Sequence, residues 1–419
     1  APEPLSFSTN SMRSLEHLTG RTWNRENTTL ELERDAIWLA GWRPENSAAK
    51  VEEIFTVSKG RDRFLTDLLA SQYDLLGYFG NASRVLTEYE SESPGDPSVS
   101  AAIRRADAKL DPSAHGLFDY FAQTGRNGLS EITRYDFGAA VRVPYRNESQ
   151  HITGGYIHRV VTPTSTVAES AYANIITLDS RLRMFDRVYW NSSAALTQFS
   201  RGFSTRPEMS NSLEYRLLDG LTWFLNGEIS NVIENSETIA QDIYQWQFGP
   251  EFLWQMNPDI EVSGQYAFGQ LSDRNGFHKG RLGCAVTMFP SPQELRIRGT
   301  ASFDSYREDT VRPIPGTLEG TVHPYFSPSD FLRGSVIVEY MQSLIDSHDD
   351  NNRTYWSVDA GGQMDSFDLF YLIFGGSVHW EICPQLTLNM RSVFILSGDY
   401  DSHSAMSSLV YQPWAHSGD

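Results

Sequence analysis

The sequence predicts a mainly β protein, an antiparallel transmembrane β-barrel of about 16 strands that follows an N-terminal α-helical segment. From residue 113 onward, apolar and polar residues alternate with a period of two over long stretches. Short turns and longer polar loops alternate between these stretches. Before residue 113, apolar residues recur at the spacing of an α-helix. We therefore expect a helical segment over residues 1–112 and a barrel over residues 113–419.

The helical segment has apolar residues at helical spacing in residues 30–42, 51–57, 64–76, 82–89 and 99–110. Further evidence for separate helices comes from Pro94-Gly95-Asp96-Pro97. This turn ends one helix and starts the next, with Asp96 as N-cap and Pro97 at the first helical position. Helix pairs closed in this way are similar to degenerate tetratricopeptide repeats, and a generic helical bundle is the alternative.

The clearest strand covers residues 244–256. Every second residue from Tyr244 to Met256 is apolar, and most of the residues between them are polar. A period of two indicates an extended strand with one apolar and one polar face. Strands of roughly 11–13 residues are about twice the usual soluble length and near the length that crosses a bilayer at a tilt.

The same pattern predicts further strands on both sides of this one. In chain order the expected strands are 117–123, 132–143, 152–161, 168–179, 188–199, 213–218, 221–230, 244–256, 260–269, 282–288, 295–304, 318–323, 332–340, 372–381, 386–394 and 405–414. We interpret residues 344–370 as one long loop, although residues 355–364 also carry a strand pattern. This interpretation keeps the Pro-containing turns at one end of the barrel. It also gives the even count that a closed single-chain barrel requires.

Alternation divides the strand residues between two faces. The face expected to meet lipid carries Tyr244, Trp246, Phe248, Phe252, Trp254, Tyr266, Phe268, Leu388 and Phe394. The face expected to line the lumen carries Glu228, Gln245, Gln247, Glu251, Glu261, Arg296, Arg298, Asp304, Glu319, Arg333, Glu339, Glu381 and Arg391. About half of these polar residues are expected only to pair with one another, as in porin walls. Since carboxylates outnumber arginines here, we expect a modest cation preference and a lumen suited to a neutral or cationic polymer.

Composition excludes several other classes. The chain has 419 residues and a formal net charge of −19 at pH 7, which argues against nucleic-acid binding. No apolar run approaches the roughly 18 residues of a membrane-spanning helix. The opening Ala1-Pro2-Glu3-Pro4 lacks a signal-peptide pattern, as expected of a mature exported chain or of a shortened one. We expect Cys284 and Cys383 to be free thiols. We expect the protein to bind neither a metal nor a cofactor.

Two clusters of acidic and imidazole side chains keep a barrel hydrolase open as an alternative. One contains His348 with Asp346, Asp349 and Asp350, and the other contains His403 with Asp399 and Asp401. Loops of this kind are far more often solvated acidic tips, and no G-x-S-x-G, H-E-x-x-H or P-loop motif is present. We therefore expect no catalysis.

A soluble β-sandwich binding protein is a further alternative, because a soluble sheet also has one apolar face. The strand length and the asymmetry between turns and loops favour the barrel.

The layout resembles the bacterial exopolysaccharide-export outer-membrane porins. The residues that carry the resemblance are Pro94-Gly95-Asp96-Pro97, the Asn257-Pro258-Asp259, Ser327-Pro328-Ser329-Asp330 and Cys383-Pro384-Gln385 turns, and Tyr411-Gln412-Pro413-Trp414. That family combines a tetratricopeptide segment with a β-barrel and exports poly-N-acetylglucosamine, cellulose and related biofilm polymers.

The resemblance implies a pore in the bacterial outer membrane with its helical segment in the periplasm. It implies lipid, a polysaccharide chain and periplasmic or inner-membrane synthesis and export proteins as partners. A helical-repeat barrel that exports surface lipoproteins, and a general porin, are the nearest alternatives.

Overall fold

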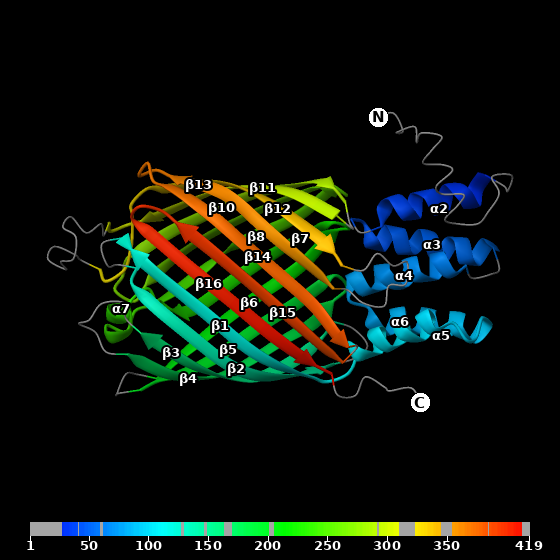
Figure 1. Cartoon of the computed structure of the whole chain (residues 1–419), viewed down its shortest axis with the longest axis horizontal. Coiled ribbons are helices and arrows are strands. Elements are labelled where there is room, and N and C mark those ends of the chain that lie inside the picture. The colour runs from blue at the N-terminus through cyan, green and yellow to red at the C-terminus, as the bar shows by residue number, and fades with distance from the viewer. Residues whose placement is uncertain are drawn as a thin grey trace.

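The computed structural model describes residues 27–40, 42–58, 62–126, 130–145, 149–162, 170–200, 205–290, 293–309, 323–344, 354–383 and 385–412. It consists of a long closed β-barrel with a group of helices at one end (Figure 1). The predicted fold class, a closed antiparallel barrel of 16 strands after N-terminal helices, is confirmed. None of the helices in these ranges is long and apolar enough to cross a bilayer.

The helices form a layered stack in which each packs on the next. They are α2 (Asn27–Leu39), α3 (Pro44–Ser58), α4 (Arg63–Leu76), α5 (Phe79–Glu92) and α6 (Pro97–Ala108). Their shared core includes Ile54, Leu65, Leu69 and Val85, all nearly inaccessible to solvent. The apolar stripe that helical spacing predicts in residues 64–76 is thus the buried face of α4.

The start of α6 confirms the capping prediction. The Asp96 carboxylate accepts hydrogen bonds from the Ser98 backbone N–H at 2.9 Å and from the Ser98 hydroxyl at 2.6 Å. Pro97 occupies the first helical turn, where no N–H partner is needed. The two bonds from Ser98 lower the pKa of Asp96 to about 2, because they stabilise the ionised form.

The barrel runs in chain order and closes where its first strand pairs with its last. Its strands are β1 (Ser113–Gly125), β2 (Ile132–Pro144), β3 (His151–Thr162), β4 (Ala171–Phe185), β5 (Val188–Phe199), β6 (Thr205–Leu218), β7 (Leu221–Asn231), β8 (Tyr244–Asn257), β9 (Ile260–Leu271), β10 (Gly276–Phe289), β11 (Gln293–Tyr306), β12 (Phe331–Ser343), β13 (Tyr355–Asp365), β14 (Phe370–Cys383), β15 (Leu386–Leu396) and β16 (Tyr400–Tyr411). The β1–β16 ladder extends from the Ala114–Tyr411 pair to the Gly125–Tyr400 pair. Every strand therefore has two hydrogen-bonded neighbours and the sheet has no edge.

Residues 355–365 correct the prediction of one long loop over 344–370. They form strand β13, which pairs with β12 and β14. One face of this strand carries Trp356, Val358 and Met364, but Ala360 and Gly362 lie between them. The strand pattern of these residues was therefore a true signal, and setting it aside for the even strand count and the Pro-containing turns was wrong.

The predicted strand over 318–323 is not part of the barrel. Residues 318–322 lie outside the described ranges, His323 lies in a bend, and β11 pairs directly with β12. The predicted number of 16 strands was thus right, but the prediction counted residues 318–323 and left out β13. The Ser327–Asp330 turn precedes β12 at the end opposite the helices, whereas the Asn257–Asp259 turn lies at the helical end. The prediction that all Pro-containing turns share one end was therefore also wrong.

The helices contact the barrel through its rim, which we call the helical end. Glu45 forms an ion pair with Arg187 in the β4–β5 turn at 2.5 Å, and Asp219 in the β6–β7 turn accepts the Asn46 N–H at 2.8 Å. At the C-terminal end of α6, the Gln412 side chain donates a hydrogen bond to the Ala108 carbonyl at 2.9 Å. Burial at this junction raises the pKa values of both Glu45 and Asp219.

The linker between α4 and α5 also lies close to the rim. Gly77 has φ +79° and ends α4 in the left-handed conformation, with its N–H bonded to the Asp74 carbonyl at 3.0 Å. A Cβ at this position would lie 2.7 Å from the Ser149 side chain in the β2–β3 turn. Both the backbone angle and the close approach therefore require glycine.

Deleting residues 27–108 is expected to leave a barrel that still folds and inserts into detergent or lipid. The reason is that the barrel closes through β1–β16 without any helix, and the helices contact its rim. Heat-modifiable migration on a gel, measured for the full chain and the deletion variant, checks this. A deletion variant that never shows the compact, faster-migrating form would mean that the helices are needed to assemble the barrel.

Candidate functional site: the barrel interior and its two ends

The polar residues predicted to line the lumen form cross-strand pairs along β7–β12. Three of the arginines contact carboxylates: Arg296 contacts Glu261 at 3.1 Å, Arg298 contacts Glu339 at 3.0 Å and Arg333 contacts Asp304 at 2.6 Å. All these side chains are partly exposed. Since each carboxylate faces a guanidinium, this part of the wall carries both signs of charge side by side.

Two predicted carboxylates are bonded to amides instead. Glu228 accepts from Gln247 at 2.8 Å, and Glu251 accepts from Asn226 at 2.9 Å. Gln245 donates to the Ser230 hydroxyl at 3.3 Å in the same β7–β8 ladder. Because amides carry no charge, the β7–β8 wall is locally more negative than the β9–β12 wall.

The remaining predicted lumen residues lie apart from this group. Glu381, on β14 at the helical end, contacts Arg105 of α6 at 3.5 Å. Arg391 on β15 interacts electrostatically with Asp359 on β13. Glu319 lies outside the described residues.

The opposite wall contains charged residues that the prediction omitted. Arg159 on β3 contacts Asp136 on β2 at 2.8 Å, and Arg134 contacts Asp119 on β1 at 2.7 Å. Further along, Glu214 on β6 is bonded to Arg181. These residues alternate with apolar ones at a period of two, so the signal was present in the sequence. Together with the β9–β12 pairs, they give the interior a mixed charge.

The predicted lipid-facing residues lie on the other face of the strands. The exposed side chains among them are Tyr244, Trp246, Phe248, Trp254, Tyr266, Phe268 and Phe394. Phe252 and Leu388 are half-buried, and Phe252 packs against Trp223 with ring centroids 5.5 Å apart. This face also carries the free thiol of Cys284, and Cys383 at the end of β14 is free as well.

At the end opposite the helices, which we call the loop end, the β7–β8 loop folds into the barrel. This loop contains the short helix α7 (Ser236–Ala240), visible beyond β3 and β4 in Figure 1. Ile239 is 2% exposed and packs against Ile132, Val161 and Ala173. Those residues come from the inner faces of β2, β3 and β4. The loop therefore occupies part of the mouth rather than extending outward.

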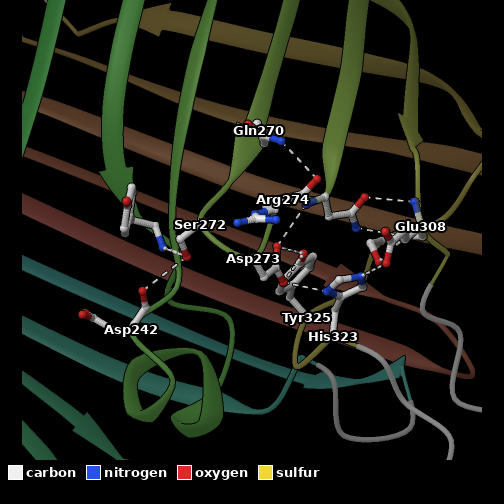
Figure 2. A network of polar contacts seen from close by, with 11 residues as sticks. Asp242, Gln270, Ser272, Asp273, Arg274, Glu308, His323 and Tyr325 are labelled. Atoms are coloured by element: carbon white, nitrogen blue, oxygen red, sulfur yellow. Dashed lines mark hydrogen bonds and ion pairs between the residues drawn. The ribbon is translucent and has the colours of Figure 1, made fainter.

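A polar network joins the β9–β10 and β11–β12 loops at this same end (Figure 2). Asp273 accepts the Tyr325 hydroxyl at 2.8 Å and contacts His323 Nδ1 at 2.6 Å. The other ring nitrogen of His323 lies 3.1 Å from Glu308. Both His323 and Tyr325 are at least 95% buried. Burial, followed by the bond to Asp273, raises the pKa of Tyr325.

Glu234 connects the β7–β8 loop to this network. Its carboxylate accepts the Phe326 backbone N–H at 3.1 Å, and its carbonyl accepts from Gln123 on β1 at 3.1 Å. Arg126 covers the rings of Phe326 and Tyr400 at 4.2 Å and 4.5 Å. Loops from four parts of the barrel thus meet at Glu234 and Phe326. We call these residues, with Asp273, Glu308, His323 and Tyr325, the loop cluster.

The predicted hydrolase clusters do not form a site in the described residues. Asp401 and His403 lie within β16 rather than in a loop, and His403 packs edge-on against Phe394 at 5.2 Å. His348 and its neighbouring aspartates lie outside the described residues. In the ranges that the structure covers, no group of three or more His, Cys, Asp or Glu residues is arranged to hold a metal ion.

Comparisons with known proteins concern the fold. No protein-family profile and no curated protein matches the chain. A solved structure described as a bacterial polysaccharide outer membrane secretin is similar with a TM-score of 0.55 and 12% identity, covering 73% of this chain and 99% of that one. Pseudomonas aeruginosa OccK7 (OpdD) has a TM-score of 0.37 and 10% identity, covering 72% and 97%. Pseudomonas aeruginosa OccK3 (OpdO) has a TM-score of 0.39 and 9% identity, covering 73% and 96%.

The loop cluster is expected to hold the loop end more tightly closed in acid. Desolvation raises the pKa of Glu234 above its ordinary value of 4.5, so the closed state favours the protonated carboxyl. That stabilisation is complete below pH 4.5 and is lost as the pH rises through the raised pKa. Open probability in single-channel recordings should therefore fall on acidification.

Replacing Glu234 with Gln is expected to flatten this pH profile, while Glu88→Gln on α5 serves as the control that leaves it unchanged. A wild-type pore that opens on acidification, or a Glu234→Gln variant with the wild-type profile, would contradict the role of Glu234.

Proposed function

We propose that this protein forms a pore in a bacterial outer membrane and exports a polysaccharide chain through the barrel. The observation that supports this proposal most directly is the closed 16-strand barrel, whose fold is similar to that of the polysaccharide secretin. Its interior is polar, and many of the polar side chains there pair with one another. Only closed barrels and helices satisfy every backbone hydrogen-bonding group in lipid. A sheet without edges, whose other face exposes aromatic residues, meets that requirement.

The interior supports passage rather than tight binding. Sugar hydroxyls both donate and accept hydrogen bonds, and the wall offers amides, carboxylates and guanidinium groups in alternation, such as Gln247, Glu251 and Arg298. Many similar, partly exposed sites permit exchange of hydrogen bonds from one position to the next, which conduction requires. The predicted lumen residues are proposed to contact the glycan in this way.

The orientation follows from the lengths of the connections. Most connections at the helical end are short turns such as Asn257–Asp259, the connection over residues 344–354 being the long one, while the α7 loop and the longer β11–β12 loop lie at the loop end. Outer-membrane barrels keep short turns in the periplasm and longer loops outside. We therefore propose that α2–α6 lie in the periplasm, where they receive the polymer from synthesis and export proteins, and that the loop cluster is the outer gate.

A general porin is the second candidate function. The observation that favours it is the inward-folded α7 loop, because such a loop narrows a mouth to the size of small solutes. The ion pairs on both walls would also suit small charged solutes. Conductance that neutral oligosaccharides fail to block, while small ions and amino acids pass, would favour this candidate.

Arg in place of Phe248 is expected to destabilise the barrel by about 2–4 kcal/mol, the cost of a cation facing the bilayer core. Gln247→Arg is the matched control. Gln247 lies next to Phe248 in β8 but on the opposite face of the sheet, where it bonds to Glu228 of β7. That change is expected to cost less than about 1 kcal/mol. Denaturant-induced unfolding in lipid vesicles measures both. Equal losses at the two positions would reverse or remove the assignment of faces.

Purified protein in a planar bilayer is expected to conduct with modest cation selectivity, and neutral oligosaccharides are expected to block the current transiently. Replacing Glu251, Glu261 and Glu339 with Gln should lower the cation selectivity, because each change removes one negative charge from the wall. The opposite control, Arg296→Gln with Arg298→Gln, should raise it. An anion-selective wild type, or no conductance even with Glu234 and Asp273 replaced to weaken the loop cluster, would contradict the proposed function.

A further inference from the structure

A cavity of about 450 Å³ lies where the helical segment meets the inner wall of the barrel. Helices α4, α5 and α6 form one side, and inner-face residues of β14, β15 and β16 form the other. This size falls in the range of about 300–1,000 Å³ that is usual for small-molecule sites. The cavity is thus shared between two parts of the chain that are far apart in sequence.

The charged residues around the cavity are balanced and paired. Arg105 of α6 contacts Glu381 of β14 at 3.5 Å, Arg63 contacts Asp67 at 2.5 Å, and Lys109 is bonded to Asp74. Three cations therefore face three carboxylates among its lining residues. Because each of these charged side chains already has a partner of opposite charge, a charged ligand would lose its water without gaining a new ion pair, which is unfavourable.

Neutral polar groups complete the lining. Asn389 and Thr387 of β15 and Gln412 after β16 contribute amide and hydroxyl groups from the barrel side, and Ser71 contributes a hydroxyl from α4. His379 lies 2.5 Å from Asn389 and is held in place by stacking on Tyr355 at 4.9 Å. Groups that both donate and accept suit a ligand whose own groups do both.

We propose that this cavity binds a short neutral saccharide segment, so that it is an entry subsite between the helical segment and the lumen. The ligand class rests on the proposed function, and the preference for a neutral sugar rests on the paired charges. Since α4–α6 and the barrel wall both line the cavity, a bound segment contacts the two parts of the chain at once. Binding there would therefore place one end of the polymer at the helical end of the barrel.

Isothermal titration of the full chain in detergent with three trisaccharides tests this subsite. The probes are the N-acetylglucosamine trisaccharide, which is neutral, the glucosamine trisaccharide, which is cationic, and the galacturonic acid trisaccharide, which is anionic. The neutral probe is expected to bind at least about tenfold more tightly than either charged probe, because each charged trisaccharide carries three ionisable groups and desolvating even one uncompensated charge has about this effect. Absence of binding by the neutral probe, or equal binding of all three, would overturn the proposal.

Charge variants separate a binding role from a merely structural one. Glu381→Gln leaves the cavity with one excess cation, so the preference should move toward the anionic probe. Arg105→Gln should move it toward the cationic probe, and the double variant should restore the neutral preference. Arg84→Gln is the matched control, because Arg84 pairs with Glu88 on α5 at 3.0 Å and does not line the cavity. Preferences that stay unchanged in the two single variants would overturn the subsite.

Conductance measured on the same preparations keeps this test distinct from that of the proposed function. A conducting pore that binds no trisaccharide would overturn the entry subsite and leave the pore standing. Binding of the neutral probe by a protein that does not conduct, even with Glu234 and Asp273 replaced, would support the subsite and contradict the proposed pore.

Discussion

The closure of the sheet by β1 and β16 is the constraint on which the rest of the structure depends. A backbone N–H or C=O left unpaired in hydrocarbon costs several kcal/mol, so an open sheet edge is not tolerated there. The ladder from Ala114–Tyr411 to Gly125–Tyr400 removes that edge. An even number of strands also brings both ends of the barrel sequence to one rim. The end of the helical segment and the end of β16 therefore meet at the same rim, where Gln412 bonds to Ala108.

Closure also determines how the polar face is satisfied. Once alternate side chains point inward, their charges have only one another, the loops and water as partners. Many of these charged side chains form ion pairs with residues of neighbouring strands, such as Arg298–Glu339 and Arg159–Asp136. A pair as exposed as Arg298–Glu339 contributes little to stability, typically about 0–1 kcal/mol. Arg159 and Asp136 are largely buried and are joined by two hydrogen bonds, at 2.8 Å and 2.9 Å. All of these pairs shape the field inside the barrel, which is mixed on most of the wall and more negative at Glu228 and Glu251.

Sequence patterns predicted what depends on local periodicity and missed what depends on long-range contact. The strands with bulky apolar faces and the Asp96–Pro97 helix start were predictable, since each reflects neighbouring residues. Strand β13 carried a strand pattern but was assigned to a loop, because counting it would have broken the even strand number and separated the Pro-containing turns. The loop cluster was missed for a different reason: Asp273 and His323 are 50 positions apart in the chain, and no spacing rule encodes that pairing. The cavity lined by Arg105 and Glu381 likewise requires the docked position of α6.

The two ends of the barrel are held by different chemistry, and this has a mechanical consequence. At the helical end, contacts such as Glu45–Arg187 and Arg216 to the Leu76 carbonyl join helices to the turns while the cavity beside α6 stays open. At the loop end, Glu234, His323 and Tyr325 join loops to one another across the mouth. A hydrogen bond to a carboxylate, as in this cluster, contributes only about 1.5–3 kcal/mol net, because water replaces it when it breaks. The loops of the loop cluster can thus separate without breaking a strand ladder, and the proposed outer gate depends on this difference between the two ends.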